Sequence, residues 1–186
     1  LMASIQKKYI GLLGGSFDPA HKGHLSISKI AIKKLKLKKI YWLVTKKNPF
    51  KNKTYYSLDE RIKYARKITK AQTKIKTIYL DNIVKSSRII DVINYFIKKK
   101  RIKNIYFIIG SDNLIRFHKW KNWKKIVKLV KLIVFSRRGY DKKGKKSIVV
   151  KKFKKRIIFI KNNPIPISST QLKIRQNLIF NENQRN

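Results

Sequence analysis

The stretch YIGLLGGSFDPAHKGHL, at residues 9–25, decides the fold of this chain. It opens with an apolar run over residues 9–13, which predicts a buried strand. Gly14 and Gly15 follow, and two glycines allow a sharp turn and a close approach of a ligand to the backbone. Apolar residues then recur with helical spacing from residue 22 to residue 35. The stretch therefore predicts a strand, a glycine-rich turn and a helix.

Two of the three histidines, His21 and His24, stand in this turn. Their spacing of three places both on one face at the start of the predicted helix. A helix N-terminus offers unpaired N–H groups and positive potential, which suits phosphate. Metal binding is the weaker alternative, since no carboxylate or thiol ligand accompanies the pair; a plain strand–turn–helix with incidental histidines is the other. The turn is thus predicted to bind phosphate.

Outside this stretch, short apolar runs alternate with longer amphipathic segments. Further strands are predicted at residues 40–44, 75–80, 105–109, 132–135 and 157–160. Further helices are predicted at residues 57–71, 89–97, 123–129 and 168–178, and residues 137–155 read as a loop with some helix. A capping box of Ser57 and Glu60 opens the first of them.

Such alternation predicts an α/β, Rossmann-like doubly wound fold, with a mainly parallel sheet and helices on both faces. Ligands bind sheets of this kind outside the carboxyl ends of the strands. The turn after the first strand is therefore the expected place of the site.

Length and composition point to one domain over residues 1–186. The chain is 42% hydrophobic, and it contains neither a repeat nor a linker rich in Pro, Gly or Ser. Cysteine is absent, which excludes disulfides and thiolate metal sites. No apolar run approaches the roughly 20 residues that span a bilayer, and the start lacks a signal-peptide core. We therefore expect a cytoplasmic protein that does not insert into a membrane.

The charge balance is extreme, because 49 Lys and Arg face only 8 Asp and Glu, for a net charge of +41. Such a balance predicts salt-sensitive attraction to polyanions, as in a nucleic-acid-binding protein. The alternative is codon drift, since Lys, Ile and Asn codons are built mostly from A and T. Lysine is spread along the chain, and only ten of the 49 are Arg, the usual bidentate reader of bases. Both features favour drift, with nonspecific polyanion binding compatible with either.

Several motifs carry a resemblance to a known family. The segment at residues 14–19, followed by His-Lys-Gly-His at residues 21–24, resembles the signature of the HxGH nucleotidylyltransferase superfamily. Its fuller form is similar to that of bacterial nicotinate-nucleotide adenylyltransferases. The match continues at residues 108–114, at residues 132–140 and at residues 167–170, and it stays in register over nearly the whole chain.

The resemblance implies a reaction in which the phosphate of nicotinate mononucleotide attacks the α-phosphorus of ATP and pyrophosphate leaves. A phosphate monoester has its second pKa near 6, so the nucleophile is already anionic and no general base is needed. Catalysis then rests on positioning and on charge stabilisation. By resemblance, His21 and His24 are the catalytic residues that contact the ATP phosphates, and His24 stabilises the charge that grows on the α-phosphate.

By the same resemblance, ATP is bound by the residues of the first turn and of later loops and helix starts. These are Gly14, Gly15, Ser16, Phe17, Gly23, Lys51, Gly110, Asp112, Ser168, Ser169, Thr170, Lys173 and Arg175. Lys51 stands where the family carries a longer Pro-Pro-His-Lys form, and this chain lacks that histidine. Lys173 replaces a family arginine, which keeps the charge and loses the bidentate fork. The alternatives are a solvated lysine at position 51 and simple helix capping by Asp112 and by the hydroxyls at residues 168–170.

The nicotinate mononucleotide is assigned, again by resemblance, to Ser87, Arg88, Ile89, Trp120 and Arg138. Trp120 occupies the place of the aromatic that stacks on the pyridine ring, with a core or rim aromatic as the alternative. The run Ser87-Arg88-Ile89 replaces the family's Ser-Tyr-Thr, so that two hydroxyls are lost. Backbone N–H groups at this helix start and the Arg88 guanidinium remain as donors for a carboxylate.

The resemblance also implies Mg²⁺ as the companion of ATP. Such an ion bridges phosphates and keeps waters, so few protein ligands are required, and no protein metal site is predicted. Two alternatives stay open at this point. One is an adenylyltransferase for nicotinamide mononucleotide or another phosphorylated metabolite, and the other is a basic nucleic-acid-binding protein.

Overall fold

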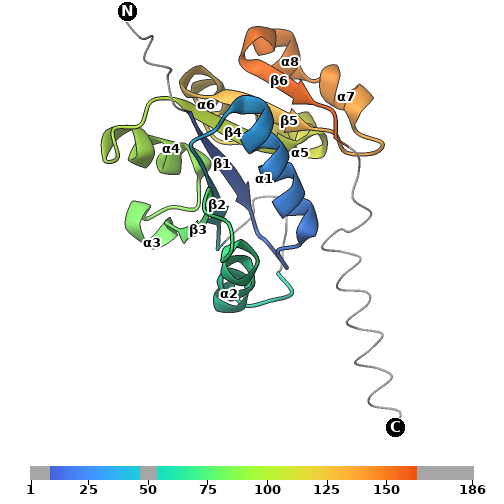
Figure 1. The fold of residues 1–186 in the computed structure, drawn as a ribbon. Helices are drawn as coiled ribbons and strands as arrows, with labels where there is room; N and C mark the ends of the chain where they lie inside the picture. The colour runs from blue at the N-terminus through green and yellow to red at the C-terminus, as the bar shows by residue number, and fades with distance from the viewer. Residues whose placement is uncertain (1–8, 47–53, 163–186) are drawn as a thin grey trace, which may run out of the picture.

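Six parallel strands form one sheet at the centre of the molecule (Figure 1). The computed structural model describes residues 9–46 and 54–162. The strands are β1 (Ile10–Gly15), β2 (Lys39–Val44), β3 (Ile75–Tyr79), β4 (Ile105–Gly110), β5 (Lys131–Phe135) and β6 (Ile157–Ile160). Their order is β3-β2-β1-β4-β5-β6, with every neighbouring pair parallel. This is the order of a Rossmann-type sheet, with its switch point between β1 and β4, and it confirms the predicted fold class.

Helices connect these strands and cover both faces of the sheet. They are α1 (Lys22–Leu35), α2 (Leu58–Thr69), α3 (Asp81–Val84), α4 (Ile89–Lys98), α5 (Ser111–Arg116), α6 (Trp123–Leu129), α7 (Asp141–Lys145) and α8 (Ile148–Phe153), with 3-10 turns η1 (Phe117–Lys119) and η2 (Lys154–Arg156). Buried residues of α1 and α2 join one core cluster, and those of α4, α5, α6 and α8 join the other. Figure 1 shows α1 lying across the front of the sheet.

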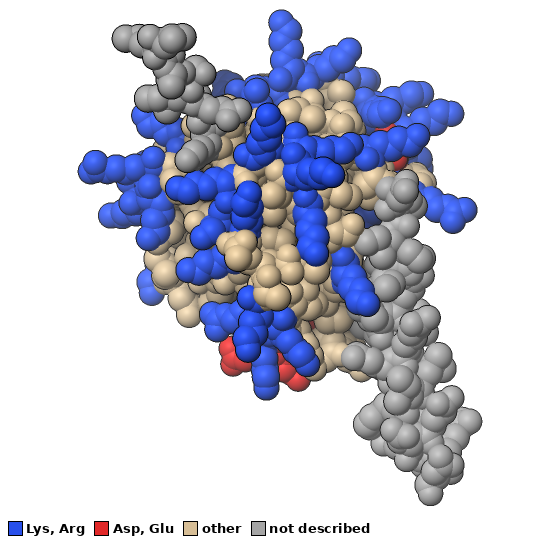
Figure 2. All heavy atoms as spheres, in the orientation of Figure 1, with Lys and Arg blue, Asp and Glu red and all other residues tan. Residues whose placement is uncertain are grey.

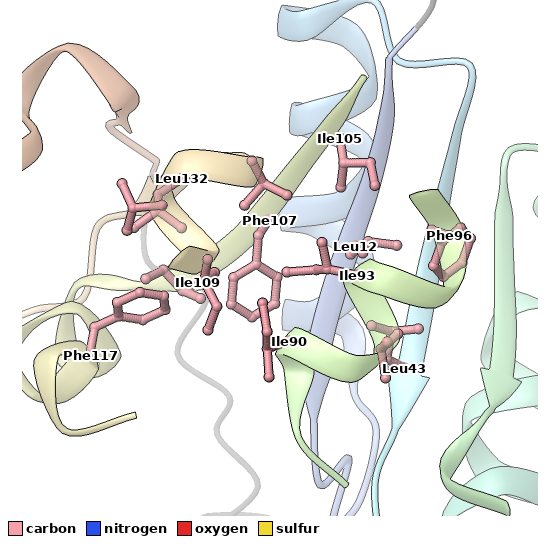
Figure 3. Close-up of a cluster of buried hydrophobic side chains, with 14 of the residues drawn as sticks. Leu12, Leu43, Ile90, Ile93, Phe96, Ile105, Phe107, Ile109, Phe117 and Leu132 are labelled. Carbon is pink, nitrogen blue, oxygen red and sulfur yellow. The ribbon is translucent and has the colours of Figure 1, made fainter. Parts of the chain in front are cut away.

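The two core clusters exist because successive strand residues point to opposite faces. In β4, Phe107 belongs to the cluster under α4, whereas Ile108 belongs to the cluster under α1. In Figure 3, Ile90, Ile93 and Phe96 of α4 point at the side chains of the central strands. Both faces of the sheet are therefore buried under helices, as expected for strands that are apolar along their whole length.

Some boundaries differ from those predicted. Gly14 and Gly15 are the last residues of β1, paired with Leu43 and Val44, so the predicted turn at the glycines is wrong. Strand β3 ends at Tyr79, and the short helices α3, α7 and α8 had no distinct sequence pattern. The predicted helix at residues 168–178 lies outside the described residues.

The surface is dominated by cations. Figure 2 shows Lys and Arg side chains over most of the visible face, with few acidic atoms, the larger group of which lies at the α2 end. That end carries Asp59 and Glu60 in the first turn of α2. No helix in the described ranges is both long and apolar enough to cross a membrane.

Candidate active site

The carboxyl ends of the strands meet at one edge of the sheet. Parallel register sets Gly15 beside Val44, Val44 beside Tyr79, and Gly110 beside Phe135. The segments that follow these strands hold the described part of the predicted site. They are therefore brought together by the sheet itself, as expected for a doubly wound fold.

The chain turns after β1 at residues 16–20. Phe17 takes a positive φ of 47°, and the next peptide bond, Asp18–Pro19, is cis. The buried Asp18 carboxylate accepts hydrogen bonds from the backbone N–H groups of Tyr55, at 2.9 and 3.1 Å, and Tyr56, at 2.9 Å. The exposed backbone of Gly14, just before the turn, stays open to close approach by a ligand.

His21 and His24 cap the start of α1 reciprocally. His21 Nδ1 accepts the N–H of Gly23 at 3.0 Å, and His24 Nδ1 accepts the N–H of His21 at 3.2 Å. Their ring centroids lie 3.9 Å apart, which confirms that the two histidines share one face. Because each Nδ1 is an acceptor, the proton of each neutral imidazole must reside on Nε2. The helix start thus presents two oriented Nε2–H donors.

Aromatic packing fixes the ring of His24. Phe17 is 2% exposed, packs 4.8 Å from His24 and stacks 5.0 Å from Trp42. Trp42 Nε1 donates to Ser28 Oγ at 2.9 Å, and that hydroxyl donates to the carbonyl of His24 at 2.8 Å. The Phe17 side chain therefore supports His24 from within the core.

His21 is held neutral. Burial, together with the nearby positive charge of Arg137, lowers its pKa from 6.5 to about 4. A neutral ring is required by the cap, since protonated Nδ1 cannot accept the Gly23 N–H. At pH 7 His21 therefore acts as a hydrogen-bond donor through Nε2, and not as a cation.

A buried arginine ties this turn to the neighbouring strand. Arg61 of α2 is 1% exposed, and its guanidinium donates to the carbonyls of Ser16 at 2.7 Å and Thr45 at 2.8 Å. Its Nε donates to the carbonyl of Tyr56 at 3.3 Å. Burial lowers the pKa of Arg61, and the charges of Asp18 and Asp81 oppose that shift. One fork thus fixes the ends of β1 and β2 together.

The segment after β5 carries a cationic side chain, Arg137, that sequence analysis did not assign to the site. Arg137 Nε is 3.7 Å from Asp112 Oδ1, and the Arg137 N–H donates to Ser111 Oγ at 3.0 Å and to Asp141 Oδ1 at 3.1 Å. A Cβ on Gly110 would lie 2.3 Å from Asp112 Oδ1 and 3.2 Å from the Arg137 side chain, so a larger residue there would require these two side chains to shift. The half-exposed guanidinium of Arg137 acts on His21 electrostatically, which sets it beside the histidine pair.

Asp112 does not cap α5, contrary to the alternative weighed above. The N-cap residue is Gly110, and Asp112 lies in the first turn of the helix. Its Oδ1 is buried and has no hydrogen-bond partner in the described part of the chain. The ion pair with Arg137 is the interaction that this oxygen makes there.

The other flank of the site follows β3. Asp81 Oδ2 accepts hydrogen bonds from Thr45 Oγ1 at 3.2 Å, the N–H of Lys46 at 2.9 Å and Ser87 Oγ at 2.5 Å. Arg88 is exposed and is the N-cap of α4, which lacks a side-chain cap hydrogen bond within the described residues. The first N–H groups of α4, from Ile89 on, therefore receive no hydrogen bond from the side chain of the N-cap residue.

Trp120 packs on the α4 side of the sheet. Its ring lies 4.9 Å from Phe117 and 5.9 Å from Phe107, and it is partly buried. Trp120 therefore lies at the rim of the core, where part of its ring packs against core aromatics. Arg138 is exposed beside Arg137. Six predicted ATP ligands lie outside the described residues: Lys51, Ser168, Ser169, Thr170, Lys173 and Arg175.

The missed residues share a signal in the sequence. Only ten of 49 cations are Arg, and Arg61, Arg137 and Arg156 each make contacts that use the guanidinium fork or its long reach. In a lysine-rich chain, an arginine marks a place where one side chain must serve several acceptors. Asp81 and Asp18 stand out in the same way, as two of only eight acids.

No group of three or more His, Cys, Asp or Glu capable of holding a metal occurs in residues 9–46 and 54–162. An ion at this edge would therefore depend on phosphate oxygens and water for most of its ligands.

Comparison with known proteins places the chain among nucleotidyltransferases. Residues 12–176 match the family model described as cytidylyltransferase-like. A protein of Pelagibacter ubique named a probable nicotinate-nucleotide adenylyltransferase is 50% identical over 90% of this chain and 93% of its own length. One of the same name from Nitratiruptor is 36% identical over 89% and 87%. Among solved structures, Plasmodium falciparum nicotinic acid mononucleotide adenylyltransferase complexed with NaAD matches with a TM-score of 0.69 and 21% identity, over 88% of this chain and 82% of that one.

Proposed function

Because the chain belongs to the cytidylyltransferase-like family, and within it to the nicotinate-nucleotide adenylyltransferases, we propose that its sheet edge is where AMP passes from ATP to nicotinate mononucleotide. The products are deamido-NAD and pyrophosphate, which makes the enzyme a step in NAD biosynthesis. The observation that carries this assignment is the reciprocal cap of His21 and His24, in which both Nδ1 atoms accept backbone N–H groups, so that Nε2 is the donor of each neutral ring at this helix N-terminus. Donors at such a place suit phosphate oxygens.

The chemistry follows from these donors. The mononucleotide phosphate arrives as an anion, so the site has no base to supply. His24, held by Phe17, donates to the α-phosphate oxygen that gains charge in the transition state. Arg137 supplies a positive charge that acts on His21, and we assign it to the phosphates. The assignment of Arg138 to the mononucleotide stays a prediction. Gly14 and Gly15 let the nucleotide approach the end of β1.

The mononucleotide lies, in this proposal, toward the start of α4. Its uncapped first N–H groups suit the nicotinate carboxylate, and Arg88 adds a charge-assisted donor. The Ser87 hydroxyl donates to Asp81 and therefore has no proton left for a carboxylate. Trp120 offers a partly exposed ring for the pyridine, although much of that ring packs on Phe117.

Mg²⁺ belongs to the proposal as a companion of ATP. Asp112, with its carboxylate 3.7 Å from Arg137 Nε, is the acid after β4 that could contribute to holding such an ion. When bound, the ion neutralises phosphate charge. We further propose that residues 1–186 are one nucleotidyltransferase domain working in the cytoplasm, where both substrates are metabolites. The family predictions for Ser16, Gly23 and the six residues outside the described ranges remain predictions.

The test is pyrophosphate release from ATP and Mg²⁺ with nicotinate mononucleotide, nicotinamide mononucleotide or no acceptor. We expect kcat/KM to be higher for the nicotinate form, and Arg88→Ala to narrow that preference. The paired variant His21→Ala/His24→Ala should be inactive while it still folds. Better use of the nicotinamide form would refute the acid preference alone. Silence with every acceptor, combined with tight nucleic-acid binding, would leave the binding-protein alternative standing.

A further inference from the structure

Asp81 is a partly buried acid at a junction of three segments. A single oxygen, Oδ2, accepts from the Thr45 hydroxyl, from the Lys46 N–H and from the Ser87 hydroxyl. Thr45 and Lys46 follow β2, Asp81 itself opens α3 after β3, and Ser87 precedes α4. One carboxylate oxygen therefore joins the end of the β2 strand to the entry of α4.

The neighbouring hydrogen bonds around α3 are local. The backbone N–H of Ser86 returns to the Asp81 carbonyl at 3.1 Å, which keeps the α3 turn compact but stays within that segment. The Arg88 N–H binds Ser86 Oγ at 3.1 Å, again locally. The contact from Ser87 to Asp81 is thus the described side-chain bond that sets the α4 entry against the sheet edge.

We propose that Asp81 is a positioning residue that fixes the mononucleotide end of the site, by holding the start of α4 in register with the end of β2. The inference rests on the proposed function, because it concerns where the α4 N–H groups stand relative to a bound mononucleotide. Asp81 touches no substrate in this account. Its effect travels through Ser87, and a displacement of about 1 Å at a reacting centre costs roughly a hundredfold in rate.

Hydrogen-bond geometry makes the proposal testable with two substitutions. In Asp81→Asn the amide oxygen can stand at the Oδ2 position and accept the same three bonds, without the charge. In Asp81→Ala all three bonds are lost. A positioning role therefore predicts that Asn keeps most of the wild-type kcat/KM for nicotinate mononucleotide, and that Ala loses it by roughly ten- to a hundredfold. The KM for ATP should stay near its wild-type value in both.

A double-mutant cycle identifies the route. If Asp81 acts through Ser87, then Ser87→Ala should lower kcat/KM for the mononucleotide, and Asp81→Ala/Ser87→Ala should be no worse than Asp81→Ala alone. If the two substitutions instead lower kcat/KM independently, so that the loss in the double variant is the product of the two single losses, the proposal is overturned. Equal damage from Asn and Ala would overturn it as well, since it would show that the negative charge itself is needed.

Two controls separate this inference from its premise. Asp59→Ala removes an exposed acid from the first turn of α2 and should leave both KM values unchanged. Thermal unfolding of every variant checks that the fold persists. An unaltered enzyme that does not use nicotinate mononucleotide would defeat the proposed function. An active enzyme whose Asp81→Ala variant matches it in kcat/KM would defeat only the positioning role.

Discussion

In the proposed site, each histidine of the first turn uses one ring nitrogen for the fold and offers the other to the ligand. Nδ1 of His21 and Nδ1 of His24 complete the cap of α1, which leaves Nε2–H of both rings directed away from it. The spacing of two intervening residues is what allows the cap to be reciprocal, because it places His24 at the third helical position. The same bonds that start the helix therefore select the tautomer that a phosphate site needs.

Replacing His24 should separate these two duties. We expect His24→Ala to lower kcat. The loss should correspond to about 2.7–4 kcal/mol of transition-state stabilisation, which is the cost of removing one oxyanion-hole donor. ATP binding should weaken far less. His24→Glu keeps an acceptor for the His21 N–H, as in a capping box, but its ionised carboxylate donates no hydrogen bond. It should retain stability and still lose kcat; wild-type kcat in either variant would remove His24 from the mechanism.

His21 makes stability depend on pH. Its pKa is about 4 in the native state against 6.5 when unperturbed, so between these values the unfolded chain binds a proton that the native chain does not. The free energy of unfolding should therefore fall as pH is lowered from 6.5 to 4, by up to about 3 kcal/mol at 1.4 kcal/mol per pKa unit.

Urea unfolding at a series of pH values measures this slope. His21→Asn is the matched control, because asparagine is a good N-cap that does not titrate, and the variant should lose this part of the dependence. A wild-type protein and a variant with the same slope would contradict a neutral, buried His21.

At the scale of elements, two arginines perform similar structural tasks at opposite ends of the sheet. Arg61 of α2 joins the ends of β1 and β2 near the histidines. Arg156, before β6, donates to the carbonyls of Val127 at 3.1 Å, Lys128 at 2.8 Å and Val130 at 3.3 Å, which closes the end of α6. Both arginines donate hydrogen bonds to backbone carbonyls at the ends of helices or strands. Only Arg61 binds a carbonyl of the turn after β1, that of Ser16.

The pair provides a matched experiment. Arg61→Met should destabilise the protein by about 3 kcal/mol, since buried carbonyls lose charged donors, and it should also raise the KM for ATP because the Ser16 turn moves. Arg156→Met should cost about 1 kcal/mol, because its end of the molecule is more exposed, and should leave both KM values unchanged. Chemical denaturation and steady-state kinetics report the two effects separately. Equal kinetics in the two variants would show that Arg61 supports only the fold.

How far sequence reasoning reached depends on the kind of signal available. The strands and the long helices α1, α2 and α4 were predictable because apolar periodicity and the Ser57–Glu60 capping box are local. The position of the turn was not, because Gly14 and Gly15 could be turn residues or, as found, strand residues, and only pairing with β2 decides. The contacts of Arg137 and Asp81 were not predicted for a related reason, because each involves a partner that is far away in the sequence.

For the whole molecule, the dominant feature of both the sequence and the visible surface is positive charge. A net charge of +41 repels itself, and this repulsion is greatest at low salt, where the Debye length grows beyond about 10 Å. Lysines nevertheless cover the visible face without concentrating on one element. A dispersed field of this kind attracts any polyanion but builds no groove for a particular one.

This distinction predicts how the protein responds to salt. If the charge is a dispersed surplus, the binding of a labelled oligonucleotide should weaken log-linearly with salt and ignore its sequence, while kcat and the free energy of unfolding change little. Replacing the exposed Lys33, Lys34 and Lys36 at the end of α1 by Gln should reduce the salt slope as much as replacing the exposed Lys142, Lys143 and Lys145 of α7. Fluorescence anisotropy measures both slopes. A reduction confined to one triplet would identify a defined nucleic-acid surface there, and unfolding at modestly lowered salt would show that self-repulsion governs the fold.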